Sequence, residues 1–321
     1  MRGLACALVL FASCAQAEAP MVDANSWLKR IQHAAQRLSY TGTFVFRQGE
    51  RNETSRITRI IDESGDHEHL EVLDGQPREV IRHGEEVRCY LPERKVILVE
   101  RRTGQRSFPA LLPTHTTHLN ELYSLSLGES VRIAGFETQS VLLTPKDDLR
   151  YGYKLWADKS TGMLLKARIL NERNETLEEF SFTHLRIGGE IRRELLLPRV
   201  AMRGAAWHVE QALIKQTRLA DAGWQIKASL PGFERIVEVK RQRRDAASIG
   251  QIVFSDGMSA VSVFIEPTAG RQEALRSGLS TMGAMNSYTR ELGDHVITVL
   301  GEVPVANVRR IGNAVEFSRQ P

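Results

Sequence analysis

The chain has 321 residues, of which 42% are hydrophobic and 26% are charged. This ordinary globular composition excludes a collagen-like, intrinsically disordered or multi-spanning membrane protein. Lys and Arg number 43 against 39 for Asp and Glu, and the resulting net charge of +4 permits binding to an anionic lipid or an acidic peptide without demanding nucleic acid.

Residues 1–17 have the features of a signal peptide. Arg2 supplies a short basic region, and residues 4–12 form an apolar core that is too short to span a bilayer. Residues 15–17 read Ala-Gln-Ala, which is a small-x-small cleavage site. We therefore expect cleavage after Ala17 and export of the mature chain.

The cysteines leave one alternative open. Residues 11–14 form an imperfect lipobox with Phe where Leu is usual, so lipidation at Cys14 would tether the chain to a membrane, but the Ala-x-Ala site is the cleaner match. After cleavage Cys89 is alone and has no intrachain disulfide partner. Cys89 lies in a strand pattern and is expected to be a small core residue, because no Cys-His-Asn signature that would favour a catalytic thiol surrounds it.

The mature chain is expected to begin with one helix and to continue as strands. Asn25 or Ser26 is the expected N-cap of the helix, which has one apolar face. That face carries Trp27, Leu28, Ile31, Ala35 and Leu38. Alternating or short apolar runs between Gly-containing turns then predict strands. These strands are expected at 43–47, 55–61, 69–73, 79–82, 87–91, 95–100, 130–134, 139–144, 151–157, 162–170 and 177–183.

The number of strands favours one fold class. About eleven antiparallel strands are too many for a flat sheet, so we expect a strongly curved sheet or part-open β-barrel around the helix, with a short helix near Leu119. An irregular stretch with Gly188-Gly189 and Pro198 indicates a linker. Beyond it, strands at 233–240, 249–254, 260–265, 288–292 and 296–300 and a helix from Pro304 predict a small α+β domain. The expected organisation is a signal peptide 1–17, a large β domain 18–190, a linker 191–206 and a small α+β C-terminal domain 207–321.

Patterns typical of catalysis or metal binding are weak. The sequence has neither a Gly-x-Ser-x-Gly elbow nor a phosphate-binding glycine loop. His67 and His69 would share one face of a strand, but two ligands do not make a metal site, and surface histidines beside a turn are the better interpretation. His115 and His118 are expected to be solvated. We therefore predict no enzyme, no catalytic residue, no metal and no cofactor.

A curved sheet with one apolar face left unfilled would form a groove for acyl chains. The simpler alternative is an ordinary core in which the same side chains pack on the helix through Trp27 and Ile31. The candidate lining residues are Phe44, Phe46, Leu70, Val72, Leu91, Val141, Leu143, Leu155, Phe180 and Phe182.

Basic residues could bind an anionic headgroup or an acidic peptide. The densest run is 240–244, for which a solvated loop beside a strand is the competing interpretation. Arginine suits phosphate because its planar fork can bind two oxygens at once. The candidate cations are Arg78, Arg82, Lys240, Arg241, Arg243 and Arg244.

Several segments, taken in order, resemble one known family. They include Leu-Ser-Tyr-Thr-Gly-Thr-Phe-Val-Phe at 38–46, Arg-Tyr-Gly-Tyr-Lys-Leu-Trp at 150–156, Ser-Asp-Gly at 255–257 and Ile-Thr-Val-Leu-Gly-Glu-Val-Pro at 297–304. Their order through nearly the whole mature chain is similar to that of the RseB/MucB family, periplasmic negative regulators of the sigma-E (AlgU-type) envelope-stress response. One departure is at 228–233, where Ala-Ser-Leu-Pro-Gly-Phe replaces the usual Trp-Leu-Pro-x-Gly-Phe.

The resemblance implies a function in regulated binding. It implies a large domain that resembles periplasmic lipoprotein carriers, and a small α+β domain. It also implies a periplasmic protein that binds the periplasmic segment of a single-span anti-sigma factor (RseA/MucA type), shields it from proteolysis and is released by lipopolysaccharide or lipid. The alternatives are a periplasmic lipid or lipoprotein carrier and, less favoured, an exported hydrolase. Whether the protein forms a homo-oligomer is left open.

Overall fold

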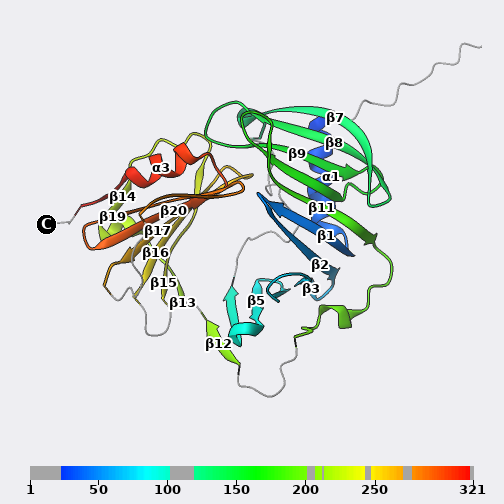
Figure 1. The fold of residues 1–321 in the computed structure, drawn as a ribbon, viewed down its shortest axis with the longest axis horizontal. Coiled ribbons are helices and arrows are strands. Elements are labelled where there is room, and N and C mark those ends of the chain that lie inside the picture. The colour runs from blue at the N-terminus through cyan, green and yellow to red at the C-terminus, as the bar shows by residue number, and fades with distance from the viewer. Residues whose placement is uncertain are drawn as a thin grey trace, which may run out of the picture.

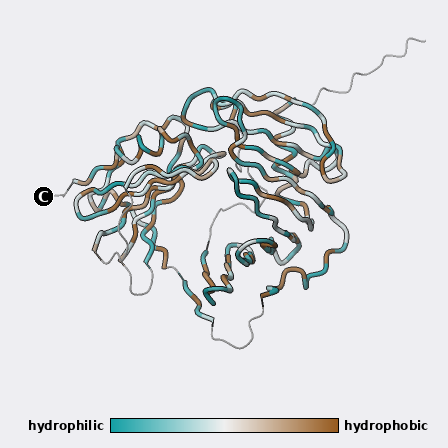
Figure 2. Tube along the Cα trace, viewed as in Figure 1, coloured by the Kyte–Doolittle hydropathy of each residue, from teal (hydrophilic) through white to brown (hydrophobic). Residues whose placement is uncertain are grey.

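The computed structural model describes residues 23–101, 119–200, 207–211, 213–242, 247–269 and 277–318. They form a large sheet and a smaller one, each with its own apolar core (Figure 1). Apolar and polar residues alternate along many strands of both sheets (Figure 2), as expected for sheets with one buried face. Within these residues, no helix is both long and apolar enough to cross a membrane. The expected α+β class, with a large antiparallel sheet and a smaller second unit, is confirmed.

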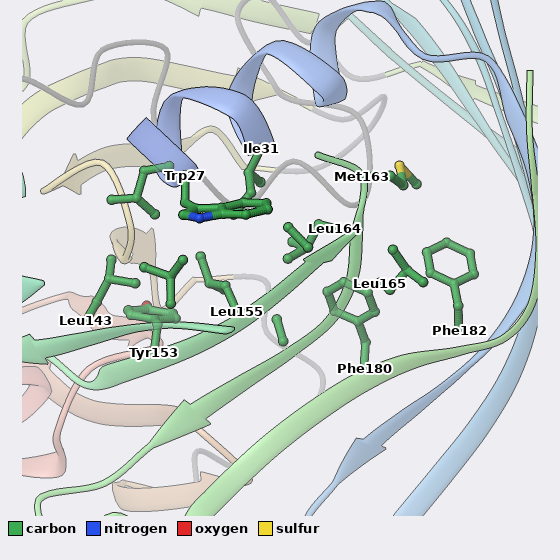
Figure 3. Packing of buried hydrophobic residues seen from close by; sticks show 14 of the residues in the cluster. Trp27, Ile31, Leu143, Tyr153, Leu155, Met163, Leu164, Leu165, Phe180 and Phe182 are labelled. Carbon is green, nitrogen blue, oxygen red and sulfur yellow. The ribbon is translucent and has the colours of Figure 1, made fainter. Parts of the chain in front are cut away.

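Helix α1, Ala24–Arg37, covers the large sheet. Its N-cap is Asp23, whose Oδ1 accepts the amide hydrogen of Ser26 at 2.8 Å, and the expected cap residues lie inside the helix instead. Trp27 and Ile31 are buried on the apolar face, as predicted. Figure 3 shows both side chains pointing toward the sheet, onto a layer of aliphatic and aromatic residues.

The large sheet has the strand order β12-β6-β5-β4-β3-β2-β1-β11-β10-β9-β8-β7 and is open at both edges. Neighbouring strands are antiparallel, except that β12 runs parallel to β6. A short helix α2, Leu119–Leu122, precedes β7, and the 3-10 turns η1, Pro92–Arg94, and η2, Arg193–Leu196, lie near strands β5 and β3. The strands are β1 (Tyr40–Gln48), β2 (Arg51–Asp62), β3 (Gly65–Val72), β4 (Glu79–His83), β5 (Glu86–Leu91), β6 (Val96–Arg101), β7 (Tyr123–Ile133), β8 (Phe136–Pro145), β9 (Gly152–Asp158), β10 (Leu164–Leu170), β11 (Thr176–Ile187) and β12 (His208–Gln211).

The smaller sheet has the order β13-β15-β16-β17-β20-β19-β18, and helix α3, Val305–Asn313, packs on β19 and β20. Val308 and Ile311 of α3 are buried in its core. A separate two-stranded sheet joins β14 to β21, and the 3-10 turn η3 (Leu219–Ala222) precedes β14. The strands are β13 (Leu213–Gln216), β14 (Trp224–Ile226), β15 (Glu234–Gln242), β16 (Ile249–Ser255), β17 (Ala260–Pro267), β18 (Gly278–Met282), β19 (Met285–Leu292), β20 (His295–Gly301) and β21 (Val315–Phe317).

The chain between the two cores takes part in both sheets. Strand β12 is an edge strand of the large sheet, although it lies within 207–321, the range predicted for the small domain. Strand β13 follows after residue 212 and pairs with β15 at the edge of the smaller sheet. We use large domain for α1 to β11 and small domain for β13 to β21, while the finer limits predicted for the linker stay a prediction.

Candidate functional site

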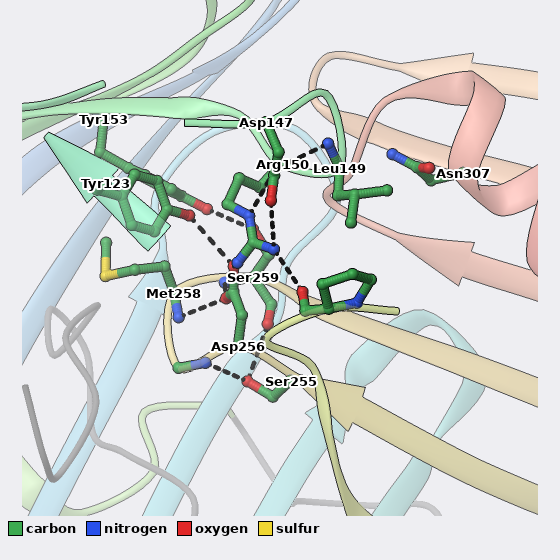
Figure 4. Close-up of polar contacts among 12 residues, drawn as sticks. Tyr123, Asp147, Leu149, Arg150, Tyr153, Ser255, Asp256, Met258, Ser259 and Asn307 are labelled. Carbon is green, nitrogen blue, oxygen red and sulfur yellow. Dashed lines mark hydrogen bonds and ion pairs between the residues drawn. The ribbon is translucent and has the colours of Figure 1, made fainter. Parts of the chain in front are cut away.

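A buried ion pair joins the two domains. Arg150, just before β9, donates from Nη1 to Oδ2 of Asp256 at 2.8 Å, and both side chains are 0% exposed. Asp256 lies in the turn between β16 and β17, and its Oδ1 accepts the backbone amides of Met258 at 2.9 Å and Ser259 at 2.7 Å. The turn therefore presents a fixed carboxylate to the large domain (Figure 4).

The other two nitrogens of the Arg150 guanidinium also donate hydrogen bonds. Its Nε and Nη2 bind the two carboxylate oxygens of Asp147 at 2.9 and 3.0 Å, and Nη2 also donates to the carbonyl oxygen of Pro231 at 2.7 Å. Burial raises the pKa of Asp256, although hydrogen bonds from Ser259 and the charge of Arg150 act against that shift. An ion pair buried this deeply stabilises only when its partners are all present, so removal of one partner leaves an uncompensated charge.

Two tyrosines of the large domain form hydrogen bonds with the turn that carries Asp256. The hydroxyl of Tyr123 donates to Asp256 Oδ2 at 3.3 Å, and the hydroxyl of Tyr153 shares a hydrogen bond of 2.9 Å with Ser259 Oγ. Both aromatic side chains belong to the core below α1. The small-domain turn therefore docks directly against the core of the large domain.

A second group of contacts lies at the β18–β19 hairpin. Glu178 of β11 accepts the Ala284 amide at 2.9 Å and the Gln48 side-chain amide at 2.7 Å. A Cβ on Gly283 would lie 2.5 Å from Gln48 Cγ, and its φ of +60° also favours glycine. The hairpin can approach β1 and β11 this closely because residue 283 has no side chain.

Asn286 at the start of β19 links further groups. Its side-chain amide donates to the Tyr151 hydroxyl at 2.9 Å and to the Val303 carbonyl at 2.8 Å. Asn307 of α3 donates to the carbonyl of Asp148 at 3.0 Å. These directional contacts hold the two domains in one relative position.

The ten candidate groove residues lie in different surroundings. Phe46 and Leu70 are partly buried against the core below α1, Val72 is buried on β3, and Leu91 is partly buried on β5. The other six are buried within the core that also contains Trp27 and Ile31, the arrangement described above as the simpler alternative. These six are Phe44, Val141, Leu143, Leu155, Phe180 and Phe182.

The candidate cations do not form one group of shared contacts. Arg78 is exposed and binds Glu53 at 3.1 Å, and Arg82 donates to the carbonyl of Gly84. Lys240 and Arg241 lie on β15, where Arg241 reaches Glu100 of β6 at 3.5 Å. Arg243 and Arg244 lie outside the described residues, as do Ala17, Cys14, His115 and His118. Cys89 is partly buried on β5 and is not in a disulfide.

The expectation of surface histidines on β3 is wrong. His67 and His69 are both buried, because β3 is paired on both sides and η2 covers it. Nε2 of His69 lies 2.9 Å from Glu79 Oε2, and its Nδ1 lies 2.7 Å from the Leu195 carbonyl oxygen. Among the described residues, no group of three or more His, Cys, Asp or Glu side chains is arranged to hold a metal ion.

Comparison with known proteins decides the family. The model of the MucB/RseB N-terminal domain matches residues 23–200, and that of the MucB/RseB C-terminal domain matches residues 218–316. The chain belongs to the MucB/RseB family. It is 28% identical over 319 residues to the "Sigma factor AlgU regulatory protein MucB" of Pseudomonas aeruginosa, with 98% of each chain covered. It is 23% identical over 316 residues to the "Sigma-E factor regulatory protein RseB" of Haemophilus influenzae, with 96% of this chain and 95% of the relative covered.

Solved structures of MucB are similar over both domains. MucB in complex with MucA(peri) has 27% sequence identity and a TM-score of 0.69, with 93% of this chain and 100% of that one covered. The Pseudomonas aeruginosa MucA/MucB complex has 27% identity and a TM-score of 0.70, covering 92% and 99%. MucB alone has 25% identity and a TM-score of 0.65, covering 92% and 98%.

Sequence reasoning missed the residues that join the domains. Arg150 and Asp256 lie in two of the segments by which the chain resembles MucB/RseB proteins, 150–156 and 255–257, but were assigned no role. A charged residue at the start of an apolar strand was the available signal, although Arg150 also has a local partner in Asp147. Its partner across the interface, Asp256, is 106 residues away, so no local pattern could identify it.

Proposed function

We propose that this protein binds the periplasmic segment of a single-span anti-sigma factor of the RseA/MucA type. The observation that carries the proposal is its similarity, over both domains, to MucB in a complex with MucA(peri). The contacts between the domains support it, because a rigid pair of domains offers a partner one continuous surface without an entropy cost for ordering them. The site of action is the periplasm, reached through the signal peptide expected at 1–17.

Binding would act by protecting the partner. A regulated protease needs access to an extended stretch of the anti-sigma factor, and a bound regulator covers that stretch. The sigma factor then stays sequestered, which makes this protein a negative regulator of the envelope-stress response. The names of the relatives as sigma factor regulatory proteins are consistent with this non-enzymatic activity.

Lipopolysaccharide or a related lipid would release the partner. Two ligands oppose each other when each binds a different state of the same element. Six candidate groove residues are buried against α1, so an acyl chain would enter there only if α1 and the sheet separated. Lipid binding would thereby change the shape of the large domain, while arginines or lysines would hold the phosphates.

The test is a competition experiment with the purified chain. A fluorescent periplasmic segment of the anti-sigma factor is titrated with protein, alone and with saturating lipid A, and anisotropy is followed. We expect saturable binding that is at least tenfold weaker with lipid A. Lack of binding without lipid would refute the partner, whereas binding that lipid A leaves unchanged would refute only the release mechanism.

The role of the basic run is tested by charge reversal. Lys240, Arg243 and Arg244 are changed together to Glu, while Arg241 is kept because it binds Glu100. We expect this variant to bind lipopolysaccharide more weakly than the unaltered chain does when both are measured at low salt. A control variant reverses two exposed charges elsewhere, Arg309 and Arg310 of α3. Equal binding of lipopolysaccharide by both variants and the unaltered chain would remove this run from the mechanism.

A further inference from the structure

Two histidines face each other across neighbouring strands of the large sheet. His67 of β3 and His83 of β4 are directly opposite in the strand register, and their Nδ1 atoms are 2.9 Å apart. His67 is 9% exposed, whereas His83 is exposed to solvent. The pair therefore has one fixed ring and one ring that can adjust and that solvent can reach.

Hydrogen bonding determines the tautomer of His67. Ser64 Oγ donates its one hydrogen to Asp62 Oδ1 at 2.6 Å, so it can only accept in its 2.8 Å contact with His67 Nε2. His67 therefore carries a hydrogen on Nε2, and its Nδ1 presents a lone pair toward His83. In the structure the hydrogen between the two Nδ1 atoms then comes from His83.

The surroundings of His67 match those of a metal-binding imidazole. Such imidazoles donate their other nitrogen to a carboxylate or another acceptor, which fixes the ring and makes it a better ligand. Here Ser64 connects that nitrogen to Asp62, whose Oδ1 is also 3.7 Å from Nε2. Asp62 is itself held by an ion pair with Arg193 of η2. The ring of His67 is thus oriented before any ligand arrives.

We propose that His67 and His83 bind one divalent late transition-metal cation through their Nδ1 atoms. Zinc–nitrogen bonds of 2.0–2.1 Å in tetrahedral geometry place two nitrogens about 3.3 Å apart. The observed 2.9 Å is shorter than this separation, so binding requires the exposed His83 ring to rotate outward and to carry its hydrogen on Nε2 instead. Imidazole nitrogens favour zinc, copper and nickel over magnesium and calcium.

Water would complete the coordination. The described residues contain no third side chain arranged as a ligand. Glu86 of β5 is opposite His83 in the register, but its carboxylate binds Arg88 at 2.7 Å. Two histidines are fewer than the three or four protein ligands of catalytic and structural zinc sites, so they do not make a site of either kind. The proposed site would instead hold its metal weakly and exchangeably. The proposal does not depend on the anti-sigma partner.

The first experiment is a calorimetric titration of the purified full chain with ZnCl₂. We expect one saturable site that His83→Asn weakens at least tenfold. The control is His33→Asn on α1, because His33 is an exposed histidine far from this pair in the sequence, and this variant should bind as the unaltered chain does. Ser64→Ala should weaken binding about 10–100-fold, because it removes the acceptor that fixes the ring of His67.

The second experiment needs no variant, so it stands even if a substituted chain folds poorly. Nitrogen-15 NMR of the histidine rings should show both Nδ1 signals shifting on addition of one equivalent of zinc, while Nε2 of His67 keeps its hydrogen. Either of two outcomes overturns the site. One is unshifted Nδ1 signals at saturating zinc, and the other is zinc affinity that His83→Asn leaves unchanged.

Discussion

At the scale of single residues, an unusual feature is the buried carboxylate of Glu68 on β3. Its side chain is buried and its Oε2 has no hydrogen-bond partner within the described structure. Burial raises its pKa from 4.5 to about 7, against the opposing charges of Arg59 and Arg82. The folded chain therefore binds a proton that the unfolded chain has released between these two pH values, so Glu68 makes stability fall as pH rises through this window.

We expect Glu68→Gln to remove this part of the pH dependence. Between pH 4.5 and pH 8 the free energy of unfolding should decrease in the unaltered chain more than in the variant. The difference between the two decreases should be at most about 3 kcal/mol. Urea unfolding at a series of pH values measures it. Glu316→Gln, at an exposed carboxylate bound to Lys227, is the control. Parallel stability curves for the unaltered chain and Glu68→Gln would contradict the assignment.

At the scale of elements, helix α1 is expected to stabilise the large domain through one face. Ile31 is 2% exposed and belongs to the core of the sheet, whereas Lys29 on the same helix is exposed. Ile31→Ala should lower the free energy of unfolding by about 2–5 kcal/mol, because it leaves a cavity in a packed core. Lys29→Ala should change it by less than about 0.5 kcal/mol. Chemical denaturation of both variants is the measurement, and similar losses would contradict the packing.

Alternation of burial explains which strands could be predicted. The strand β17 alternates buried side chains with exposed or partly buried ones and was expected at nearly its observed position. Strands β12, β13 and β18 are short edge strands that are mostly exposed, so their sequences carry no alternating apolar signal. Strands β14 and β21 have three residues each and depend on pairing with each other. A pairing between distant segments leaves little trace in such short sequences.

The contacts between the domains could not be predicted for a related reason. The alternation of apolar and polar residues along a strand predicts the burial of apolar residues such as Phe180 and Leu155, and both belong to the core. Arg150 and Asp256 would each be read as solvent-exposed, because a buried charge is expensive unless its partner is known. The burial of His67 and His69 likewise depends on η2 folding back over β3.

At the scale of the whole molecule, the ion pair of Arg150 and Asp256 should couple stability to partner binding. Arg150→Met leaves the buried carboxylate unpaired and should cost about 3–5 kcal/mol. Asp256→Asn keeps an oxygen that can accept the turn amides but removes the negative charge. The double variant should lose less free energy of unfolding than the two single variants lose together. Lys227→Met, at an exposed pair, is the control and should lose about 1 kcal/mol or less.

The same double-mutant cycle can be measured with the anti-sigma segment. If both domains contact the segment, loosening them makes binding weaker, because their relative order must then be restored on binding. Arg150→Met and Asp256→Asn should therefore each reduce affinity, while Lys227→Met should not. Unchanged affinity in variants that remain folded would mean that the segment contacts one domain alone.

A pair of carboxylates makes the contact between the two domains sensitive to rising pH. Glu302, just after β20, has a pKa raised to about 7, first by burial and then by the negative charge of Glu178 across the interface. Between pH 4.5 and 7 the folded chain therefore keeps a proton on Glu302 that the unfolded chain has released. The interface should loosen as pH rises through that range, because Glu302 then becomes charged. Glu302→Gln should keep the interface tight at pH 8 and flatten the dependence of the thermal midpoint on pH. Its comparison with Glu68→Gln separates the two groups, since only Glu302→Gln should also remove a pH dependence from the affinity for the anti-sigma segment.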